Sequence, residues 1–253
     1  MSKHAIITGG AKGIGESASR IFLREGFNVS ILDIDEGAGT TLAVELGKSA
    51  HYIKCDMASE EQIQSAIASA IDHFGEADVL VNNVGINPYG TVLSTSSALW
   101  DTVMNVNLKS YFLSSKEVIP SMQKIGAGVI INVASVQAFI SQSNVAAYTT
   151  AKTAILGLTR SIAVDFAPNI RCVAICPGTI ETPMLYEALK ESPNPDEVLQ
   201  ECHDMHLTKR IGKPDEVGEL IYFAASEKGG FMTGQAIRVD GGLGISIGGS
   251  KRD

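Results

Sequence analysis

Short runs of β-branched and other apolar residues recur along the chain, and longer amphipathic stretches separate them. The runs are "HAIIT" (4–8), "NVSILD" (28–33), "AHYIKC" (50–55), "DVLVNN" (78–83), "GVIINVAS" (128–135), "IRCVAIC" (170–176) and "QAIRVD" (235–240). Between them, stretches such as 60–74 place apolar residues at helical spacing. Continuous apolar strands that alternate with helices are typical of a parallel sheet covered on both faces. The pattern predicts an α/β fold, a doubly wound, seven-stranded parallel sheet with helices on both faces.

Nothing in the sequence divides the chain into parts. It has 253 residues, 45% of them hydrophobic, which suits one α/β domain or two small ones. We find no linker, no low-complexity stretch and no internal repeat. We therefore expect a single domain over residues 1–253.

The net charge of −8 argues against a nucleic-acid partner, because little here would displace counterions from phosphate. No apolar run approaches the roughly 18–20 residues that cross a bilayer, and no secretory signal is visible. The cysteines have no metal-type spacing and resemble small core residues of a reducing compartment: Cys55, Cys172, Cys176 and Cys202. We expect a cytoplasmic protein that binds neither nucleic acid nor membrane.

The first strand runs into the glycine-rich turn "TGGAKGIG" (8–15), which opens a helix from about Ile14 to Glu25. Glycines at 9, 13 and 15 let a backbone approach a pyrophosphate, and a helix N-terminus offers N–H groups and a positive dipole end. Such a turn can also be an ordinary tight turn. Its place after the first strand favours a Rossmann-type dinucleotide site.

Asp33 closes the second strand, where a carboxylate accepts hydrogen bonds from the adenosine ribose and repels a 2′-phosphate. Asp33 could instead cap the next helix, but Asp35 is equally available for that role. Lys12 argues the other way, since its ammonium could reach toward a 2′-phosphate. We give Asp33 more weight, so we expect NAD rather than NADP.

The stretch "AAYTTAK" (146–152) places Tyr148 and Lys152 one turn apart on one face of a predicted helix. Tyr-x-x-x-Lys arises often by chance, and both side chains could simply be half-exposed helix residues. A phenol beside an ammonium has a chemical use only if other groups support it.

Taken in order, these features resemble the classical short-chain dehydrogenase/reductase (SDR) family along nearly the whole chain. "TGGAKGIG" matches the family's cofactor turn, and "NNVG" (82–85) matches its N-N-A-G stretch with Val84 in place of alanine. "YTTAK" (148–152) matches its Y-x-x-x-K, and "CPGTIETPM" (176–184) matches its P-G segment. The resemblance implies an NAD(P)-dependent dehydrogenase that acts on CH–OH groups.

The resemblance makes Tyr148 the general base in oxidation and the general acid in reduction. A phenol has an unperturbed pKa of about 10, and a nearby ammonium together with the positive nicotinamide would lower it. Lys152 would supply that ammonium and also hold the nicotinamide ribose hydroxyls. The two residues thus form the centre of the predicted active site.

Two more catalytic residues follow from the resemblance. Ser135 ends a strand, where it could be a cap, but the family keeps there the serine that hydrogen-bonds the substrate oxygen. "WDTVMNVNLKS" (100–110) aligns with the family's helix that carries an active-site asparagine, and it contains Asn105 and Asn107. By position we choose Asn107, whose carbonyl would hold a water that links Lys152 to solvent.

The resemblance also implies the cofactor contacts. Asp56 would lie near the adenine, while the Ile180 backbone and the Thr182 hydroxyl would hold the nicotinamide carboxamide. The full set is Gly9, Lys12, Gly13, Ile14, Gly15, Asp33, Asp56, Met57, Asn83, Gly85, Tyr148, Lys152, Pro177, Gly178, Ile180 and Thr182.

Residues 181–208 are expected to form a lid over the substrate. Against one base, Lys190, the lid carries seven acids: Glu181, Glu187, Glu191, Asp196, Glu197, Glu201 and Asp204. That charge disfavours carriers bearing phosphopantetheine or coenzyme A. The polar candidates for substrate contact, Asn87, Gln137, Gln142 and Glu181, suit a sugar or polyol.

His203, Asp204 and His206 could suggest a metal site, but no further ligands cluster nearby in sequence, so we predict a solvated lid helix and no metal. The glycine-rich tail, 240–253, carries no catalytic signature, and we expect it at a subunit contact. The resemblance implies a homotetramer that associates through the helices bearing Trp100–Lys124 and Tyr148–Phe166.

The sequence therefore predicts an NAD-dependent oxidoreductase that interconverts a secondary alcohol or hemiacetal with its carbonyl or lactone, on a sugar or polyol. One alternative is a 3-oxoacyl-thioester reductase that uses NADPH. The other is a dinucleotide-binding sensor without turnover, which would have little need of the four residues Asn107, Ser135, Tyr148 and Lys152.

Overall fold

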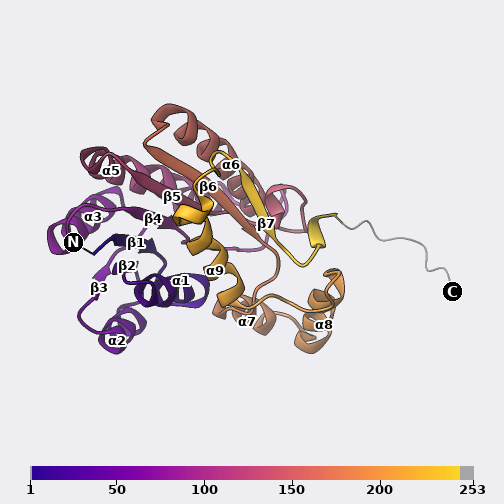
Figure 1. Cartoon of the computed structure of the whole chain (residues 1–253). Helices are drawn as coiled ribbons and strands as arrows, with labels where there is room; N and C mark the ends of the chain where they lie inside the picture. The colour runs from indigo at the N-terminus through magenta and orange to yellow at the C-terminus, as the bar shows by residue number, and fades with distance from the viewer. Residues whose placement is uncertain (1, 246–253) are drawn as a thin grey trace.

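A seven-stranded, entirely parallel sheet runs through the computed structural model, in the order β3-β2-β1-β4-β5-β6-β7 (Figure 1). The strands are β1 (His4–Thr8), β2 (Asn28–Asp33), β3 (Ala50–Lys54), β4 (Val79–Asn82), β5 (Gly128–Val133), β6 (Ile170–Pro177) and β7 (Ala236–Val239). The fold predicted from the apolar runs is confirmed.

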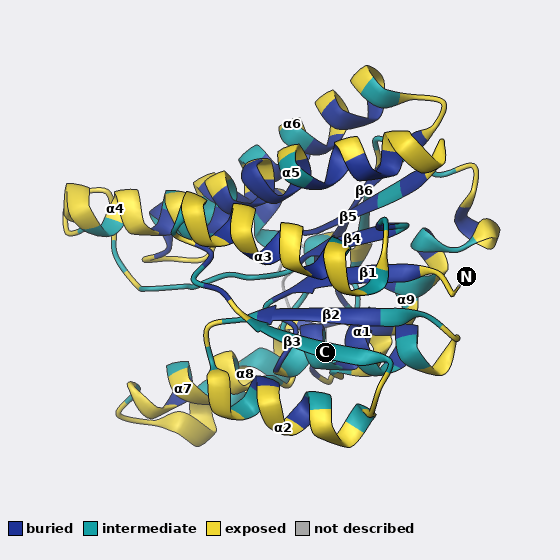
Figure 2. Cartoon of the chain, turned by 90° about the vertical axis from the view of Figure 1, so that its left-hand side faces the viewer, coloured by how far each residue is buried: buried dark blue, intermediate teal, exposed yellow. Residues whose placement is uncertain are grey.

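Helices cover both faces of this sheet, as Figure 2 shows with the strands seen between the two layers. One layer consists of α1 (Gly13–Arg24), α2 (Glu36–Leu46) and α9 (Pro214–Ala225). The other consists of α3 (Glu60–Phe74), α4 (Ser97–Met104), a π-helical turn (Asn105–Lys109), α5 (Ser110–Ile125) and α6 (Ala146–Phe166). Two helices of the segment predicted as a lid, α7 (Pro183–Lys190) and α8 (Pro195–Met205), lie between β6 and α9. Short 3-10 turns occur at Val136–Ala138, Glu227–Gly229 and Leu243–Ile245.

Successive strand residues point to opposite faces, so the sheet separates two apolar cores. Ile6 packs with the cluster under α3 and α5, whereas its neighbour Ile7 packs with the cluster under α1 and α9. Both side chains are fully buried. A strand that is buried on both faces needs an unbroken apolar run, which is the pattern seen in the sequence.

The strand order reverses direction at β1, because β2 lies on one side of it and β4 on the other. In sheets of this kind the connections diverge at such a point and leave a crevice at the carboxyl ends of the strands. The stretches after β1 and β4, "TGGAKGIG" and "NNVG", therefore meet at one place.

The segment predicted as a lid, 181–208, leaves the sheet after β6 and returns before α9, and its two ends are joined to each other. The Gly212 N–H donates to the Thr179 carbonyl and the Glu181 N–H donates to the Gly212 carbonyl, both at 2.9 Å. Arg210 forms a two-pronged ion pair with Glu216 at the start of α9. The segment predicted as a lid is thus a helical hairpin on a closed base.

The structure describes residues 2–245, so most of the tail expected at a subunit contact, 246–253, lies outside the described residues. All four cysteines lie in the described part and are free, and three of them are buried. Among residues 2–245, no helix combines the length and the apolar character that spanning a bilayer requires.

Candidate active site

The glycine-rich turn forms a cradle at the N-terminus of α1. Gly9 and Gly13 have φ angles of 60° and 56°, in the left-handed region that favours glycine. A Cβ atom at Gly15 would lie 1.9 Å from the Gly9 carbonyl oxygen, so only glycine lets α1 come this close. The Asn83 side-chain amide donates to the carbonyls of Thr8 (3.2 Å) and Gly9 (3.0 Å) and ties the end of β4 to the turn.

Asp33 and Asp35, at the end of β2, have different hydrogen-bond partners. Asp35 caps α2 by accepting the Ala38 N–H at 2.9 Å, so Asp33 does not serve as the cap. Asp33 accepts the backbone N–H groups of Ala11 and Asp35, both at 3.0 Å, which places its carboxylate beside the glycine turn. Lys12, which could have favoured a 2′-phosphate, forms an ion pair with Asp35.

Tyr148 and Lys152 lie on α6, and the Lys152 ammonium is 5.6 Å from the centroid of the Tyr148 ring. Lys152 is only 3% exposed. Its Nζ donates to the Val133 carbonyl at 2.9 Å and to the Tyr111 hydroxyl at 3.3 Å. Burial lowers the pKa of Lys152 to about 7, so near neutral pH this side chain is only partly charged.

The protein's own groups raise the pKa of Tyr148 rather than lower it. Burial disfavours the phenolate, and a hydrogen bond from Ser135 offsets part of that effect. The lowering expected from Lys152 does not outweigh burial, since Lys152 is itself desolvated and only partly charged near neutral pH.

Ser135 follows β5 directly and caps the short turn Val136–Ala138, where its Oγ accepts the Gln137 N–H at 3.1 Å. Because the oxygen accepts from the backbone, the hydroxyl proton is left to be donated. The side chain is nearly buried and lies within hydrogen-bonding reach of Tyr148. Ser135 and Tyr148 therefore come together at the carboxyl end of the sheet.

Asn107 is fully buried in the π-helical turn, whereas Asn105 is exposed. The Asn107 side chain accepts from the Ile86 N–H and donates to the Ile86 carbonyl, both at 2.8 Å. Its side-chain carbonyl is therefore bonded to the loop after β4, and this pair fixes that loop. A Cβ atom at Gly85 would lie 3.5 Å from Lys152 Nζ and 3.6 Å from Asn107 Oδ1, so Gly85 keeps the space between them open.

The P-G segment lies beside the glycine cradle. The Thr182 hydroxyl donates to the Ile180 carbonyl at 3.3 Å, and its methyl carbon would lie 3.1 Å from a Cβ at Gly13. Pro177 ends β6, and Gly178 follows it.

Of the remaining residues predicted to contact the cofactor, one faces away from the crevice. Ile14 is half-buried at the start of α1. Asp56 follows β3 and accepts the Ala58 N–H at 2.9 Å. The Met57 side chain is buried in the core under α3, so it faces away from the crevice.

The polar candidates for substrate contact lie in three places. Gln137 accepts from the Thr149 hydroxyl (3.2 Å) and donates to Gln142 (3.4 Å), so this amide pair is held by the residue that follows Tyr148 on α6. The Asn87 side-chain oxygen is buried and has no hydrogen-bond partner within the described part of the chain. Glu181, at the start of the lid, accepts from the Tyr186 hydroxyl at 2.8 Å and is exposed.

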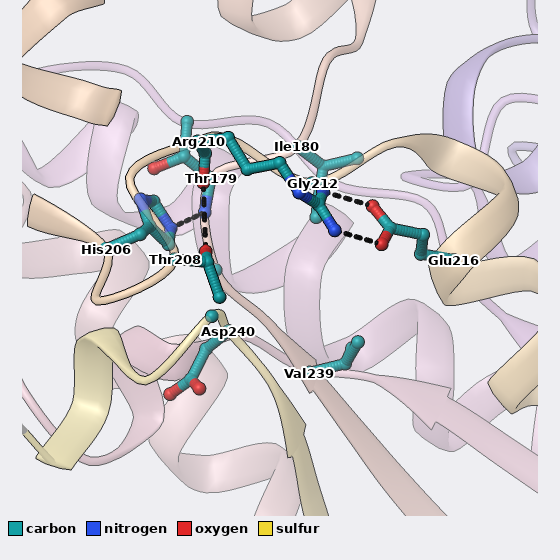
Figure 3. A pocket seen from close by; sticks show the side chains of 11 residues that line it. Thr179, Ile180, His206, Thr208, Arg210, Gly212, Glu216, Val239 and Asp240 are labelled. Carbon is teal, nitrogen blue, oxygen red and sulfur yellow. Dashed lines mark hydrogen bonds and ion pairs between the residues drawn. The ribbon is translucent and has the colours of Figure 1, made fainter. Parts of the chain in front are cut away.

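Behind the P-G segment lies a cavity of about 130 Å³ at the base of the lid (Figure 3). His206 closes one side of it: its Nδ1 donates to the Cys202 carbonyl at 2.7 Å, and its Nε2 accepts the Thr179 N–H at 3.2 Å. His203 accepts the Ile211 N–H at 3.3 Å. Both histidines, considered above as metal ligands, are thus engaged with the backbone, and residues 2–245 hold no group of side chains suited to a metal ion.

The sequence reasoning missed Tyr111, whose hydroxyl contacts Lys152. The available signal was its spacing, since Tyr111 lies one helical turn after Asn107 and therefore on the same side. A tyrosine within the run "SYFLSS" otherwise looks like a core residue.

Comparisons with known proteins extend over almost the whole chain. A family model described as enoyl-(acyl carrier protein) reductase matches residues 9–244. An uncharacterised oxidoreductase of Thermotoga maritima is 42% identical over 95% of this chain and 96% of its own length. The 2-(R)-hydroxypropyl-CoM dehydrogenase of Xanthobacter autotrophicus is 38% identical over 95% of this chain and 98% of its own. Among solved structures, the ligand-free aldohexose dehydrogenase of Thermoplasma acidophilum has a TM-score of 0.91 and 37% identity, and covers 100% of this chain and 98% of its own.

Proposed function

The chain belongs to the short-chain dehydrogenase/reductase family, and we propose that it is an NAD-dependent dehydrogenase of a sugar or polyol. It would oxidise a secondary alcohol or hemiacetal to the carbonyl or lactone. The observation that carries the proposal is the meeting of Tyr148, Ser135 and Lys152 at the carboxyl end of the sheet, beside the glycine cradle.

The residues present fit a dinucleotide. In the cradle, Gly15 has no room for a Cβ and Gly9 and Gly13 have left-handed φ angles, and a backbone without side chains is what close approach of a pyrophosphate requires. Gly85 leaves open the space bordered by Lys152 and Asn107, where a nicotinamide ribose would be held. Asp33 supports NAD, because its carboxylate stands at the ribose end and Lys12 is paired with Asp35.

The oxidised nicotinamide supplies the hydride acceptor and a positive charge near Tyr148. Tyr148 takes the proton from the substrate hydroxyl at its phenol oxygen as the C–H bond breaks. Ser135 donates to the substrate oxygen and orients it. Lys152 would hold the ribose hydroxyls of a bound cofactor and, when charged, favours the phenolate.

A raised pKa of Tyr148 in the protein means that oxidation should speed up as pH rises, because a larger fraction of the phenol is ionised. Reduction, in which the phenol gives up its proton, should be fastest at lower pH. The direction of the two profiles is a consequence of one group working as base and as acid.

The lid and the polar side chains support a small hydroxylated substrate. All seven lid acids are exposed, so the surface through which a substrate enters is negative. Gln137 and Gln142 offer amide groups bonded to Thr149 of α6, and the buried Asn87 oxygen has no hydrogen-bond donor in residues 2–245. The similar protein from Thermoplasma acidophilum is named for aldohexoses, which carry many hydroxyl donors.

The alternative is a 3-oxoacyl-thioester reductase that uses NADPH. The description of the matching family model, an enoyl-(acyl carrier protein) reductase, favours an acyl substrate. Carriers of acyl groups are anionic, so an acidic lid would weaken their docking. The carboxylate of Asp33 would likewise weaken NADPH binding.

The deciding experiment measures NADH formation from NAD⁺ by the purified protein with aldohexoses, pentoses, polyols and simple secondary alcohols, repeated with NADP⁺. The proposal expects activity on one sugar or polyol series and a preference for NAD⁺. NADPH-dependent reduction of a 3-oxoacyl thioester, with no activity on the panel, would overturn the substrate and cofactor assignments. Dinucleotide binding with no activity on any substrate would support the sensor.

We also propose a cytoplasmic homotetramer that associates through α4, α5 and α6. Phe112 on α5 and Val164 on α6 support this, since these apolar side chains are 50% and 79% exposed. Light scattering after size-exclusion chromatography should give four times the mass of one chain. A monomer would contradict the proposal.

A further inference from the structure

Tyr111 plays no part in the mechanism above, although its side chain lies against Lys152. It is fully buried in the first turn of α5. Burial raises the pKa of Tyr111 well above its usual value, so the side chain is a neutral phenol. A buried hydroxyl needs hydrogen-bond partners, and those of Tyr111 all lie at the active site.

The Tyr111 hydroxyl contacts two strand ends and the catalytic lysine. It lies 3.0 Å from the Val84 carbonyl and 2.9 Å from the Val133 carbonyl. Lys152 Nζ donates to it at 3.3 Å. Val84 immediately precedes Gly85, and Val133 is two residues before Ser135, so the hydroxyl joins the segments that border the cofactor and the substrate oxygen.

The number of protons on each group determines which group donates in each of these hydrogen bonds. A phenol has one proton and an ammonium has three. Lys152 already donates to the Val133 carbonyl at 2.9 Å. The arrangement that satisfies every group has Tyr111 donating to Val84 and accepting from Lys152. One N–H of Lys152 then remains for the space that Gly85 keeps open, 3.5 Å from its hypothetical Cβ.

The aromatic rings of Tyr111 and Tyr148 also attract the Lys152 ammonium. Lys152 Nζ lies 5.3 Å from the centroid of the Tyr111 ring and 5.6 Å from that of Tyr148. A cation within about 6 Å of an aromatic centroid is attracted by the ring's electrons. The ammonium is therefore held between two phenols, one that would react and one that cannot reach solvent.

On the basis of the proposed function, we propose that Tyr111 is a positioning residue for Lys152. Its hydroxyl and ring hold the ammonium between the ends of β4 and β5. The remaining N–H is thereby directed at the nicotinamide ribose, and the charge is kept near Tyr148. Nothing in the family motifs quoted above requires a tyrosine at this position.

The test replaces Tyr111 with phenylalanine, which keeps the ring and removes only the hydroxyl. Lys152 loses an acceptor for its charged form, so less positive charge lies near Tyr148. We expect kcat to fall about tenfold, the loss of one hydrogen bond to a charged group. The acidic limb of the kcat/KM profile for oxidation should move to higher pH, while KM for NAD⁺ changes less than kcat.

Tyr222→Phe is the matched control, because Tyr222 of α9 packs against Phe22 and Phe27 and its hydroxyl lies beside Glu25, away from the site. This variant should keep the wild-type kcat and pH profile. If Tyr111→Phe behaves like Tyr222→Phe in both, the proposal is overturned.

A second readout does not depend on turnover. In protein labelled with ¹³C at the lysine ε-carbon, the Lys152 signal is the one that Lys152→Met removes. Its pKa should be lower in Tyr111→Phe than in wild type. Tyr148→Phe, assayed in the same experiment, distinguishes a failure of the proposed function from a failure of the proposed role of Tyr111. Wild-type turnover in Tyr148→Phe would defeat the proposed function, whereas an inactive Tyr148→Phe with an unshifted Lys152 signal in Tyr111→Phe would defeat only this inference.

Should Tyr111→Phe fail to fold, 3-fluorotyrosine placed at position 111 serves instead. Fluorine makes the oxygen a poorer acceptor but leaves the ring and its proton in place. The acidic limb should then move in the same direction by a smaller amount. An unmoved limb would overturn the proposal.

Discussion

Each end of the sheet holds a cation, half-buried Arg171 at the amino end and buried Lys152 at the carboxyl end, and the two differ in how many hydrogen-bond acceptors surround them. At the amino end, Arg171 of β6 donates to five backbone carbonyls, those of Ala224, Ala225, Ser226, Gly229 and Met232. At the carboxyl end, Lys152 has one backbone carbonyl and one phenol. Neither cation forms an ion pair with a carboxylate in residues 2–245.

Buried polar groups at the two ends of the sheet can be compared in the same way, by whether their hydrogen bonds are complete. At the amino end, His4 is almost fully buried, and both ring nitrogens are bonded, to the Gly75 carbonyl and the Ser30 hydroxyl at 2.9 Å each. At the carboxyl end, the Asn87 side-chain oxygen is buried without a hydrogen-bond partner in residues 2–245, and one N–H of the Lys152 ammonium has no acceptor there. The amino end has one such atom as well, the buried Glu76 Oε2. Unpaired buried groups are costly in a folded chain, so Asn87 and Lys152 support a ligand site at the carboxyl end.

The largest expected effect is the loss of chemistry at the carboxyl end. Tyr148→Phe removes the group proposed to accept the substrate proton, so kcat should fall by about 10³-fold or more. NADH binding, followed by fluorescence, should stay close to wild type because the phenol oxygen alone is removed. A variant that still turns over within a few fold of wild type would show that another group accepts the proton.

At the amino end the expected effect is on stability alone. Arg171→Met leaves the carbonyls at the end of α9 without a donor, which should lower the free energy of unfolding by about 3 kcal/mol. Denaturant unfolding measures this, and kcat per folded molecule should be unchanged. Arg24→Met, which removes an exposed arginine paired with Glu25 and Glu219, is the control and should leave the stability almost unchanged. Equal stabilities of the two variants would contradict the role of Arg171.

The next prediction uses pH to compare Lys152 with an ordinary lysine. Its pKa is about 7 in the folded protein against 10.5 for a solvated lysine. Between these values the unfolded chain binds a proton that the folded chain does not, so the stability of wild type rises with pH. Below about pH 7 both states are protonated, and the cost of the buried charge is fully present.

Lys152→Met removes that cost and should be more stable than wild type at low pH. Its advantage should shrink by about 2 kcal/mol between about pH 7 and pH 9, measured by unfolding at each pH. Lys116→Met, which removes an exposed lysine, should differ from wild type by a constant amount over the same range. A constant difference for Lys152→Met would mean that Lys152 stays charged when buried.

The smallest expected effect concerns the choice of cofactor. Asp33→Ala removes the carboxylate at the ribose end and should lower the ratio of kcat/KM with NAD⁺ to that with NADP⁺ about tenfold, the value of a charge-assisted hydrogen bond. Lys12→Ala should leave the ratio near wild type, because Asp35 already engages that lysine. An unchanged ratio for Asp33→Ala and a raised one for Lys12→Ala would show that Lys12 decides.

The sheet and the pairing of Tyr148 with Lys152 could be predicted from the sequence, because both rest on local periodicity. The strands at 4–8 and 28–33 and the helix at 60–74 have the predicted bounds. The π-helical turn around Asn107 could not be predicted, since it forms where the side chain bonds to Ile86 across the crevice. Such a contact depends on tertiary structure.

The pKa shifts of Tyr148 and Lys152 could not be predicted from the sequence either. The sequence shows that a lysine follows Tyr148 by one turn, but it does not show how deeply either is buried. Burial reverses the expected shift of the Tyr148 pKa in the protein and lowers that of Lys152. The partner of Lys12 also depends on the fold, because Asp33 and Asp35 were both within reach in sequence.

The joined ends of the lid have a consequence for how this protein can be altered. Backbone pairing between Thr179, Glu181 and Gly212 closes the segment as a separate loop, and its hydrogen bonds at the base do not depend on which side chains the loop carries. The closure entropy of a flexible loop grows slowly, by about 0.6 kcal/mol for each doubling of length. The segment from 183 to 205 is therefore an exchangeable module, which could be replaced by a longer or shorter one while the sheet and the residues proposed for catalysis stay as they are.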